Sequence, residues 1–181
     1  AVDAPAREGA NAVRLVWRGT GTVHWSAGAQ YFDPAAAEYR QGSRQLAITR
    51  AYAKLVSARV NNKLVYREQP ITGPVQTGDV IAVRLAVAGG GDWRYLLLED
   101  PIPAGTEAMP DRSSYPLEKP ARWARLSQQE FRDQRSAFFI ESLEQGRADV
   151  MYLLKVVSEG TFRAVPARVE PMYVPGVHAS S

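Results

Sequence analysis

The fold is decided by residues 78–101, which read GDVIAVRLAVAGGGDWRYLLLEDP. Residues 80–87 are the most hydrophobic run of the chain and are rich in side chains that favour strands. Residues 92–99 form a second run of this kind, and Gly89-Gly90-Gly91 between the two is typical of a hairpin turn. The segment therefore predicts two consecutive β-strands joined by a glycine turn.

Similar runs continue on both sides of this segment. Residues 45–55 alternate so that Leu46, Ile48, Arg50 and Tyr52 fall on one face of a strand. Further strand-like runs are residues 12–17, 22–31, 136–140, 148–157 and 161–169. The turns expected between neighbouring runs are residues 18–21 and 159–160. Turn residues recur about every 8–14 positions, which predicts an all-β, antiparallel sandwich.

One segment favours a short helix near residues 127–132. Residues 127–130 read SQQE, a capping-box pattern, and Phe131, Phe138 and Phe139 are compatible with a helical stripe. We therefore expect one helical turn over 127–132, followed by a strand. Residues 109–119 contain two prolines and two serines, and they predict a long exposed loop.

The composition limits the possible chemistry. The chain has 181 residues, of which 45% are hydrophobic and 23% charged, as in ordinary globular domains. The absence of cysteine removes disulfides, thiolate nucleophiles, zinc–thiolate sites and iron–sulfur clusters. Two histidines, His24 and His178, provide little material for a metal site or a catalytic triad. The net charge of +3 is too small to argue for nucleic-acid binding.

Neither targeting nor membrane insertion is expected from the sequence. Residues 1–11 lack a basic segment followed by an apolar one, and no apolar run reaches about 18 residues. The chain opens on Ala1 rather than Met, so we expect a processed chain or a piece of a longer one.

Three acidic residues and one glycine run are the candidates for chemistry. Glu99, Asp100 and Glu107 flank a proline-rich bend, and paired carboxylates can act as general acid and base or bind a hard cation. The alternative is a strand that ends in a rigid turn, which we favour. The glycines at 89–91 lack the Lys-Ser/Thr pair of a phosphate loop. We therefore expect no enzyme activity, no metal and no cofactor.

Four segments occur in the order and spacing of one known family. Residues 73–85, 95–107 and 132–139 resemble strand entries and turns of bacterial alpha-2-macroglobulins, and residues 160–173 resemble the motif G-x-F-x-x-P-x-x-V-E-x-M-Y. The chain departs from the family pattern at Gln134, where a second acid is common, and at Thr106, where an aromatic residue often stands. The resemblance extends over residues 45–175.

The resemblance implies a domain organisation. Residues 44–181 correspond to the C-terminal macroglobulin-like domain, a fibronectin-like β-sandwich. Residues 1–43 resemble the end of the preceding CUB-type domain. The motif positions carried over are structural, namely Gly78, Asp79, Asp100, Pro103, Gly105 and Glu107.

The resemblance also implies a function. In this family a protease cuts a bait region, the molecule rearranges, and in many members an exposed thioester acylates the attacker. The thioester motif Cys-x-Glu-Gln is absent from this cysteine-free chain, so the domain would be non-catalytic. Met172 and Tyr173, placed by Glu170 and Pro171, match positions that shield the thioester before cleavage. The alternative is that both side chains simply close the sandwich.

The partners implied are other domains of a parent chain and, through the parent, target proteases. The location implied is the periplasm, within an inner-membrane-anchored lipoprotein. A second hypothesis is a protein-binding module that docks a separate cell-envelope protein. A third, a carbohydrate-binding or hydrolytic domain, depends on Glu99, Asp100 and Glu107 sharing one cleft.

Overall fold

The computed structural model describes residues 16, 18–22, 24, 45–119 and 124–181. The chain divides into two units, Ala1–Ala36 and Ala37–Ser181. In the first unit, residues 19–21 form a bend at the position predicted for a turn. The strands predicted on either side of this bend, and the CUB-type segment over 1–43, fall almost entirely outside the described residues.

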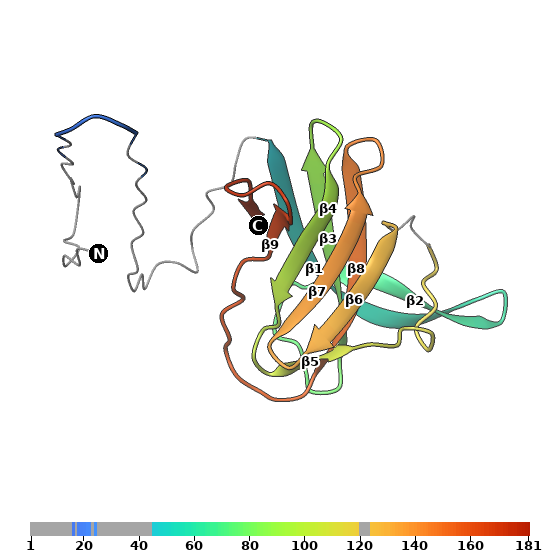
Figure 1. Ribbon diagram of the computed structural model, residues 1–181. Helices are drawn as coiled ribbons and strands as arrows, with labels where there is room; N and C mark the ends of the chain where they lie inside the picture. The colour runs from blue at the N-terminus through green and yellow to red at the C-terminus, as the bar shows by residue number, and fades with distance from the viewer. Residues whose placement is uncertain (1–15, 17, 23, 25–44, 120–123) are drawn as a thin grey trace. The chain divides into compact units, whose positions relative to one another are not determined.

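The described part of the second unit is a sandwich of two antiparallel five-stranded sheets (Figure 1). The first sheet has the order β2-β1-β3-β8-β5, and the second has the order β10-β9-β4-β7-β6. The strands are β1 (Leu46–Val60), β2 (Lys63–Pro70), β3 (Val80–Gly89), β4 (Arg94–Pro101), β5 (Thr106–Met109), β6 (Leu126–Arg132), β7 (Arg135–Ser142), β8 (Arg147–Val156), β9 (Arg168–Pro171) and β10 (Ala179–Ser180). The all-β prediction is confirmed.

The main core lies between the two sheets. Alternate residues of each strand point inward, so that Val83, Leu85 and Val87 of β3 face Leu98 of β4 and Phe138 of β7 across the core. The central strands β3 and β8 carry the near-continuous apolar runs seen in the sequence because a second, smaller cluster covers their outer face. This second cluster consists of Leu55, Val80, Ala82, Met151 and Leu153.

The loop predicted to be exposed over 109–119 in fact covers that second cluster. Tyr115 and Leu117 are partly buried against it. The loop is bonded to β2 at Tyr66, whose backbone N donates to Pro116 O at 2.8 Å and whose carbonyl accepts from Glu118 N at 3.0 Å. Prolines and serines correctly indicated irregular backbone, but they did not indicate that two apolar side chains anchor it.

The helix predicted near 127–132 is wrong. These residues form β6, which pairs with β7 from Arg132↔Arg135 up to Leu126↔Ile140. Ser127 does not cap a helix, and its hydroxyl donates instead to the Phe139 carbonyl at 3.2 Å. The chain reverses after Arg132, so Phe131 and Phe138 meet across two strands rather than along one helix. Pairing with β7 overrides the local capping signal.

Two further predictions need correction. Gly89-Gly90-Gly91 does not close a hairpin, because β3 and β4 belong to different sheets. Residues 161–169 are mostly without strand structure, and only Arg168–Pro171 forms β9. Strand β2 was missed altogether, although Asn61 and Asn62 at φ values of 49° and 63° form the kind of turn that closes a hairpin.

The first prediction concerns the core. Leu98→Ala leaves a cavity at a fully buried position on β4, so we expect the free energy of unfolding to fall by about 2–5 kcal/mol. Leu64→Ala on β2 is the matched control, because that side chain is 53% exposed and should change stability by less than about 0.5 kcal/mol. Urea denaturation of both variants measures the difference. Equal effects would contradict this assignment of inside and outside.

Candidate functional site

Four large side chains form an exposed apolar patch at one end of the second sheet. Tyr95 is 55% exposed, Met172 49%, Tyr173 74% and Val174 44%. The rings of Tyr95 and Tyr173 meet edge to face with centroids 5.7 Å apart. Such a cluster on a surface is typical of a contact site for another protein segment. We call these four residues the terminal patch.

The terminal patch is held by the pairing of β9 with β4. The register places Leu96 opposite Pro171 and Leu98 opposite Val169. Beyond that ladder, the backbone N of Met172 donates to the Tyr95 carbonyl at 2.9 Å. Tyr95 has a φ of 54°, a left-handed conformation that is uncommon for an aromatic residue. The chain itself turns after Pro171, whose carbonyl accepts from the backbone N of Val174 at 3.4 Å, and Met172 and Tyr173 in this turn are exposed.

The four predicted shielding residues have different environments. Pro171 is buried, and Glu170 is half-buried with an ion pair to Arg168 at 2.7 Å. Met172 and Tyr173 alone project from the surface. Tyr95 and Val174 were not singled out as site residues from the sequence. The signal for Tyr95 is alternation along the strand: Leu96 and Leu98 point inward, so Tyr95 falls on the outer face.

The motif pair Gly78 and Asp79 forms the turn before β3. Gly78 has a φ of 94°, and its N donates to Val156 O at 2.8 Å. The Asp79 carboxylate accepts from the backbone N of Gln76 at 2.9 Å and from Lys54 Nζ at 2.7 Å. These two donors, with the backbone bond the larger cause, hold the pKa of Asp79 below its ordinary value. The turn joins β1, β3 and β8.

A second motif turn connects β4 to β5. Thr106 donates to Pro103 O through its N at 3.2 Å and through its hydroxyl at 2.7 Å. Gly105 has a φ of 77°, and its carbonyl accepts from the backbone N of Val157 at 2.9 Å. A Cβ at Gly105 would lie 2.3 Å from the Phe162 ring, and one at Gly160 would lie 2.5 Å from it. The turn at residues 103–105 and the segment at residues 160–162 thus meet in one contact.

Asp100 is fully buried between the sheets. Its Oδ1 accepts from the Arg50 guanidinium of β1 at 2.5 Å, and its Oδ2 accepts from the Tyr152 hydroxyl of β8 at 2.8 Å. Burial raises the pKa of the Asp100 carboxyl, and Arg50 and Tyr152 offset part of that rise. Burial and the carboxylate also raise the pKa of the Tyr152 hydroxyl. The group is a structural link between the sheets, because its bonds join β1, β4 and β8 and its carboxylate is fully buried.

Tyr52 completes this buried group. Its ring lies beneath the Arg50 guanidinium, whose central carbon is 5.2 Å from the ring centroid. Burial and the charge of Asp100 raise the pKa of Tyr52 to about 12. Its hydroxyl has no hydrogen-bond partner among the described residues. The contribution of Tyr52 is therefore made by the face of its ring.

The three carboxylates proposed for hydrolytic chemistry do not share a cleft. Glu99 points out of the second sheet and pairs with Arg135 at 2.9 Å. Asp100 points into the core, and Glu107 is exposed on β5 of the other sheet, opposite Lys155. The hydrolytic hypothesis is therefore wrong. Within the described residues, no three His, Asp or Glu side chains are grouped so that they could hold a metal ion.

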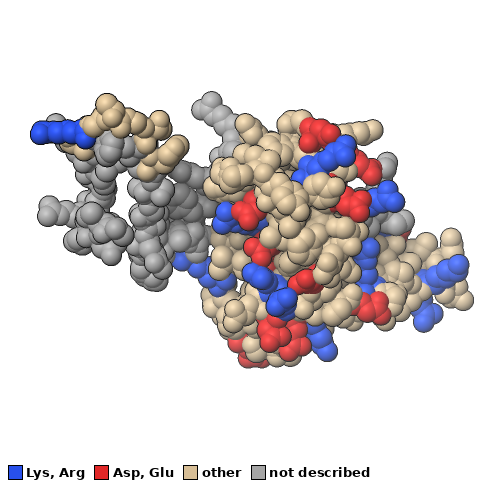
Figure 2. Space-filling model, in the orientation of Figure 1, with Lys and Arg blue, Asp and Glu red and all other residues tan. Residues whose placement is uncertain are grey.

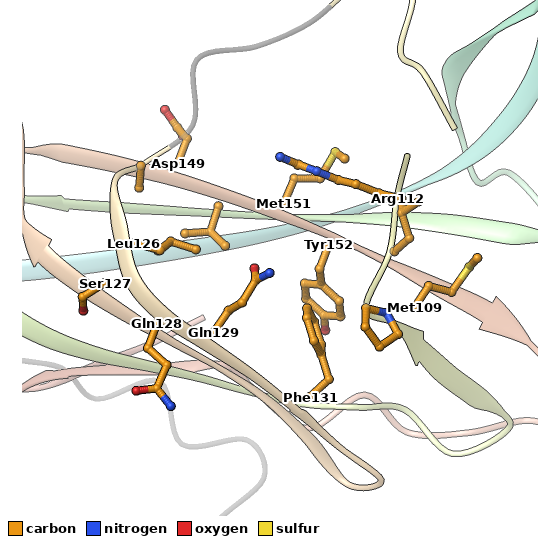
Figure 3. A pocket seen from close by; sticks show the side chains of 14 residues that line it. Met109, Arg112, Leu126, Ser127, Gln128, Gln129, Phe131, Asp149, Met151 and Tyr152 are labelled. Carbon is orange, nitrogen blue, oxygen red and sulfur yellow. The ribbon is translucent and has the colours of Figure 1, made fainter. Parts of the chain in front are cut away.

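A cleft of about 450 Å³ lies at one edge of the sandwich, between β6 and the pair β5 and β8. Figure 3 shows Phe131 and Tyr152 side by side in it, with Gln129 and Arg112 among the other side chains that line it. The two rings have centroids 6.1 Å apart. Among the described residues that line the cleft, acidic and nucleophilic groups are not clustered, so we assign it no chemistry.

Charges of both signs are interspersed over the described surface facing the viewer in Figure 2. Outward-facing residues of the second sheet are ion-paired, as in Arg132–Glu130 at 3.0 Å and Arg135–Glu99 at 2.9 Å. Paired charges of this kind give this face a mixed sign. They also set the uncharged terminal patch apart from the rest of the sheet.

Comparison with known proteins identifies relatives of one kind. Residues 46–176 match the family described as the bacterial alpha-2-macroglobulin MG10 domain. Alpha-2-macroglobulin of Xylella fastidiosa (strain 9a5c) is 28% identical over 120 residues, which cover 60% of this chain and 7% of the relative. Alpha-2-macroglobulin of Thermotoga maritima is 32% identical over 113 residues, which cover 58% of this chain and 7% of the relative.

Solved structures show the same fold. Native Escherichia coli alpha-2-macroglobulin has a TM-score of 0.63 at 24% identity, over 79% of this chain and 9% of that one. The E. coli protein activated by porcine elastase gives 0.64 at 23% identity, over 77% and 12%. Salmonella alpha-2-macroglobulin reacted with methylamine gives 0.61 at 21% identity, over 78% and 9%.

The second prediction concerns the turn at Asp79. Asp79→Asn removes a carboxylate that is stabilised by two donors, so we expect a loss of about 1 kcal/mol of unfolding free energy at pH 7. Because the pKa of Asp79 is lowered on folding, this stabilisation is present above the ordinary value of about 3.9 and is lost as the pH falls through the lowered folded value. Urea titrations from pH 7 to pH 3 should show the two proteins converging.

The control for this experiment is Glu107→Gln, an exposed side chain on β5. It should change stability by less than about 0.5 kcal/mol across the range. A constant difference between the Asp79→Asn variant and the original chain at every pH would contradict the role given to the carboxylate charge.

Proposed function

The chain belongs to the bacterial alpha-2-macroglobulin family of non-catalytic protease inhibitors, as an MG10 domain, and we propose that its terminal patch covers the thioester region of the parent protein before bait cleavage. The described domain spans less than a tenth of the curated relatives it matches. Protease trapping is therefore proposed as the activity of the parent, to which this domain contributes by packing on neighbouring domains.

The observation that carries the proposal is the exposure of Met172 and Tyr173. The alternative from the sequence, that the two side chains close the sandwich, fits poorly because most of the Tyr173 ring faces outward. The adjoining Pro171 and Val169 are buried and fix the backbone from which these side chains project. A tyrosine and a methionine offer apolar area together with a shape that adapts to the surface beneath.

An apolar cover suits a reactive acyl bond. Excluding water from such a bond slows its hydrolysis, and a cover held by few contacts can be withdrawn when the molecule rearranges. The related E. coli protein is activated by elastase, and the Salmonella protein has been reacted with methylamine. These properties support trapping and a small-amine-sensitive group in relatives, and we extend them to the parent of this chain as proposals.

Two further proposals concern the surroundings of the domain. Residues 1–43 are proposed to be the end of the preceding CUB-type domain. The parent is proposed to reside in the periplasm as an inner-membrane-anchored lipoprotein, an extension of the bacterial family membership. In the described part of the chain, no helix has the length and apolar character needed to cross a membrane.

The third prediction tests the cover in the full-length parent. The rest of the parent's sequence is first searched for the thioester motif Cys-x-Glu-Gln. If the motif is absent, covalent capture is withdrawn from the proposal. Met172→Ala with Tyr173→Ala should then raise the rate of thioester cleavage by methylamine about tenfold or more, because water and amine gain access to the bond. Release of free thiol measures the rate.

Leu64→Ala is the matched control, since it also truncates an exposed apolar side chain but lies on β2, away from the patch. The control should react at the original rate. An unchanged methylamine rate in the patch variant, with the fold intact, would overturn the proposed cover. The surviving hypothesis would then be that the patch docks a separate cell-envelope protein. The original chain should then capture that protein, and the variant with Met172→Ala and Tyr173→Ala should not.

A further inference from the structure

The connection between β8 and β9 leads to the terminal patch. Residues 157–167, which we call the strap, contain no strand and cross from the first sheet to the second (Figure 1). At its start, Val157 and Ser158 donate to the Gly105 carbonyl at 2.9 and 3.2 Å. At its end, Ala167 exchanges hydrogen bonds with Ser181. Strand β9 then follows for only four residues before the patch.

Between these two ends, the strap is bonded to the buried group. Nη1 of Arg50 donates to the Val165 carbonyl at 2.7 Å while it also donates to Asp100 Oδ1 at 2.5 Å. A single nitrogen therefore joins the strap to the second sheet. The Arg50 side chain is only 9% exposed, although the Val165 side chain faces solvent.

The position of this nitrogen is fixed from several sides. The Asp100 carboxylate is bonded by Tyr152 at its other oxygen, so it cannot rotate without losing a partner. The Tyr52 ring supports the guanidinium from its face. Arg50, Asp100 and Tyr152 come from β1, β4 and β8. The bond from Arg50 to Val165 therefore links the strap to a group that three strands hold in place.

We propose that Arg50 and Asp100 act as a positioning pair that clamps the strap at Val165 and thereby sets the position of β9 and of the terminal patch. The consequence for thioester cover rests on the proposed function, whereas the clamp itself does not. Val165 is three residues before β9, and Met172 follows directly after that strand, so displacement of the strap carries to the patch along a short stretch of backbone.

The test is hydrogen exchange of this chain, read by mass spectrometry in peptides from the strap, β9 and the core. Removing one partner would leave a buried charge without compensation, so the principal variant changes both, as Arg50→Met with Asp100→Asn. The asparagine can still accept from Tyr152. We expect peptides over residues 163–174 to exchange about tenfold faster, while peptides of β3 and β8 stay within about twofold.

The control is Arg67→Met with Glu118→Gln, which removes a bidentate but exposed ion pair at 2.7 Å between β2 and the loop over residues 109–119. It should leave exchange over residues 163–174 unchanged. If the principal variant does not fold, Arg50→Lys is judged by the same criterion, since it keeps the charge beside Asp100 but shortens the reach to Val165.

Faster exchange confined to residues 163–174 supports the clamp. Unchanged exchange there, or an equal increase in every strand, overturns it, because the pair would then be a general element of the core. The proposed function fails separately, through an unchanged methylamine rate after truncation of Met172 and Tyr173 in the parent. That result would not alter the exchange pattern of this chain.

Discussion

A carboxylate in the middle of a β-sandwich core determines much of what surrounds it. Removing an ionised group from water costs several kcal/mol unless charge and hydrogen bonds replace the lost hydration. Asp100 obtains these from Arg50 on one side and Tyr152 on the other. The strands that carry the three residues must therefore keep one spacing and one register. Pairing of the apolar faces alone would tolerate small shifts, and the buried group does not.

The terminal patch depends on this rigidity even though it lies at the surface. Strand β9 is short, and in the described part of the chain its far side pairs with just the two residues of β10. An element with so few bonds takes its position from what precedes it. The strap precedes it, and the strap is bonded at Val165 to Arg50, which is itself bonded to the buried Asp100. A buried ion pair and an exposed pair of side chains are in this way parts of one arrangement.

Much of the fold is present in the local sequence. Alternation over β1 and the apolar run of β3 follow from which faces are buried, and Gly78-Asp79 encodes a turn whose atoms bond locally. Assignment of strands to sheets is not local, so Gly89-Gly90-Gly91 gave no sign that β3 and β4 separate. The capping pattern at Ser127 likewise failed to predict the structure, because pairing of β6 with β7 outweighs the local helix signal. Arg50 shared the inward phase of Leu46, but its partner Asp100 lies on a strand that only the tertiary fold brings near.

The two tight hairpins have a consequence for the order in which the domain folds. β1 with β2, and β6 with β7, join neighbours in the sequence, so little loop entropy opposes their formation. Pairing of β3 with β8 and of β4 with β9 joins distant segments and is the slow part of folding for such a topology. The Val165 carbonyl of the strap can accept from Arg50 in its final position only when β1, β4 and β8 have assembled. The terminal patch is therefore completed last, after the core is already in place.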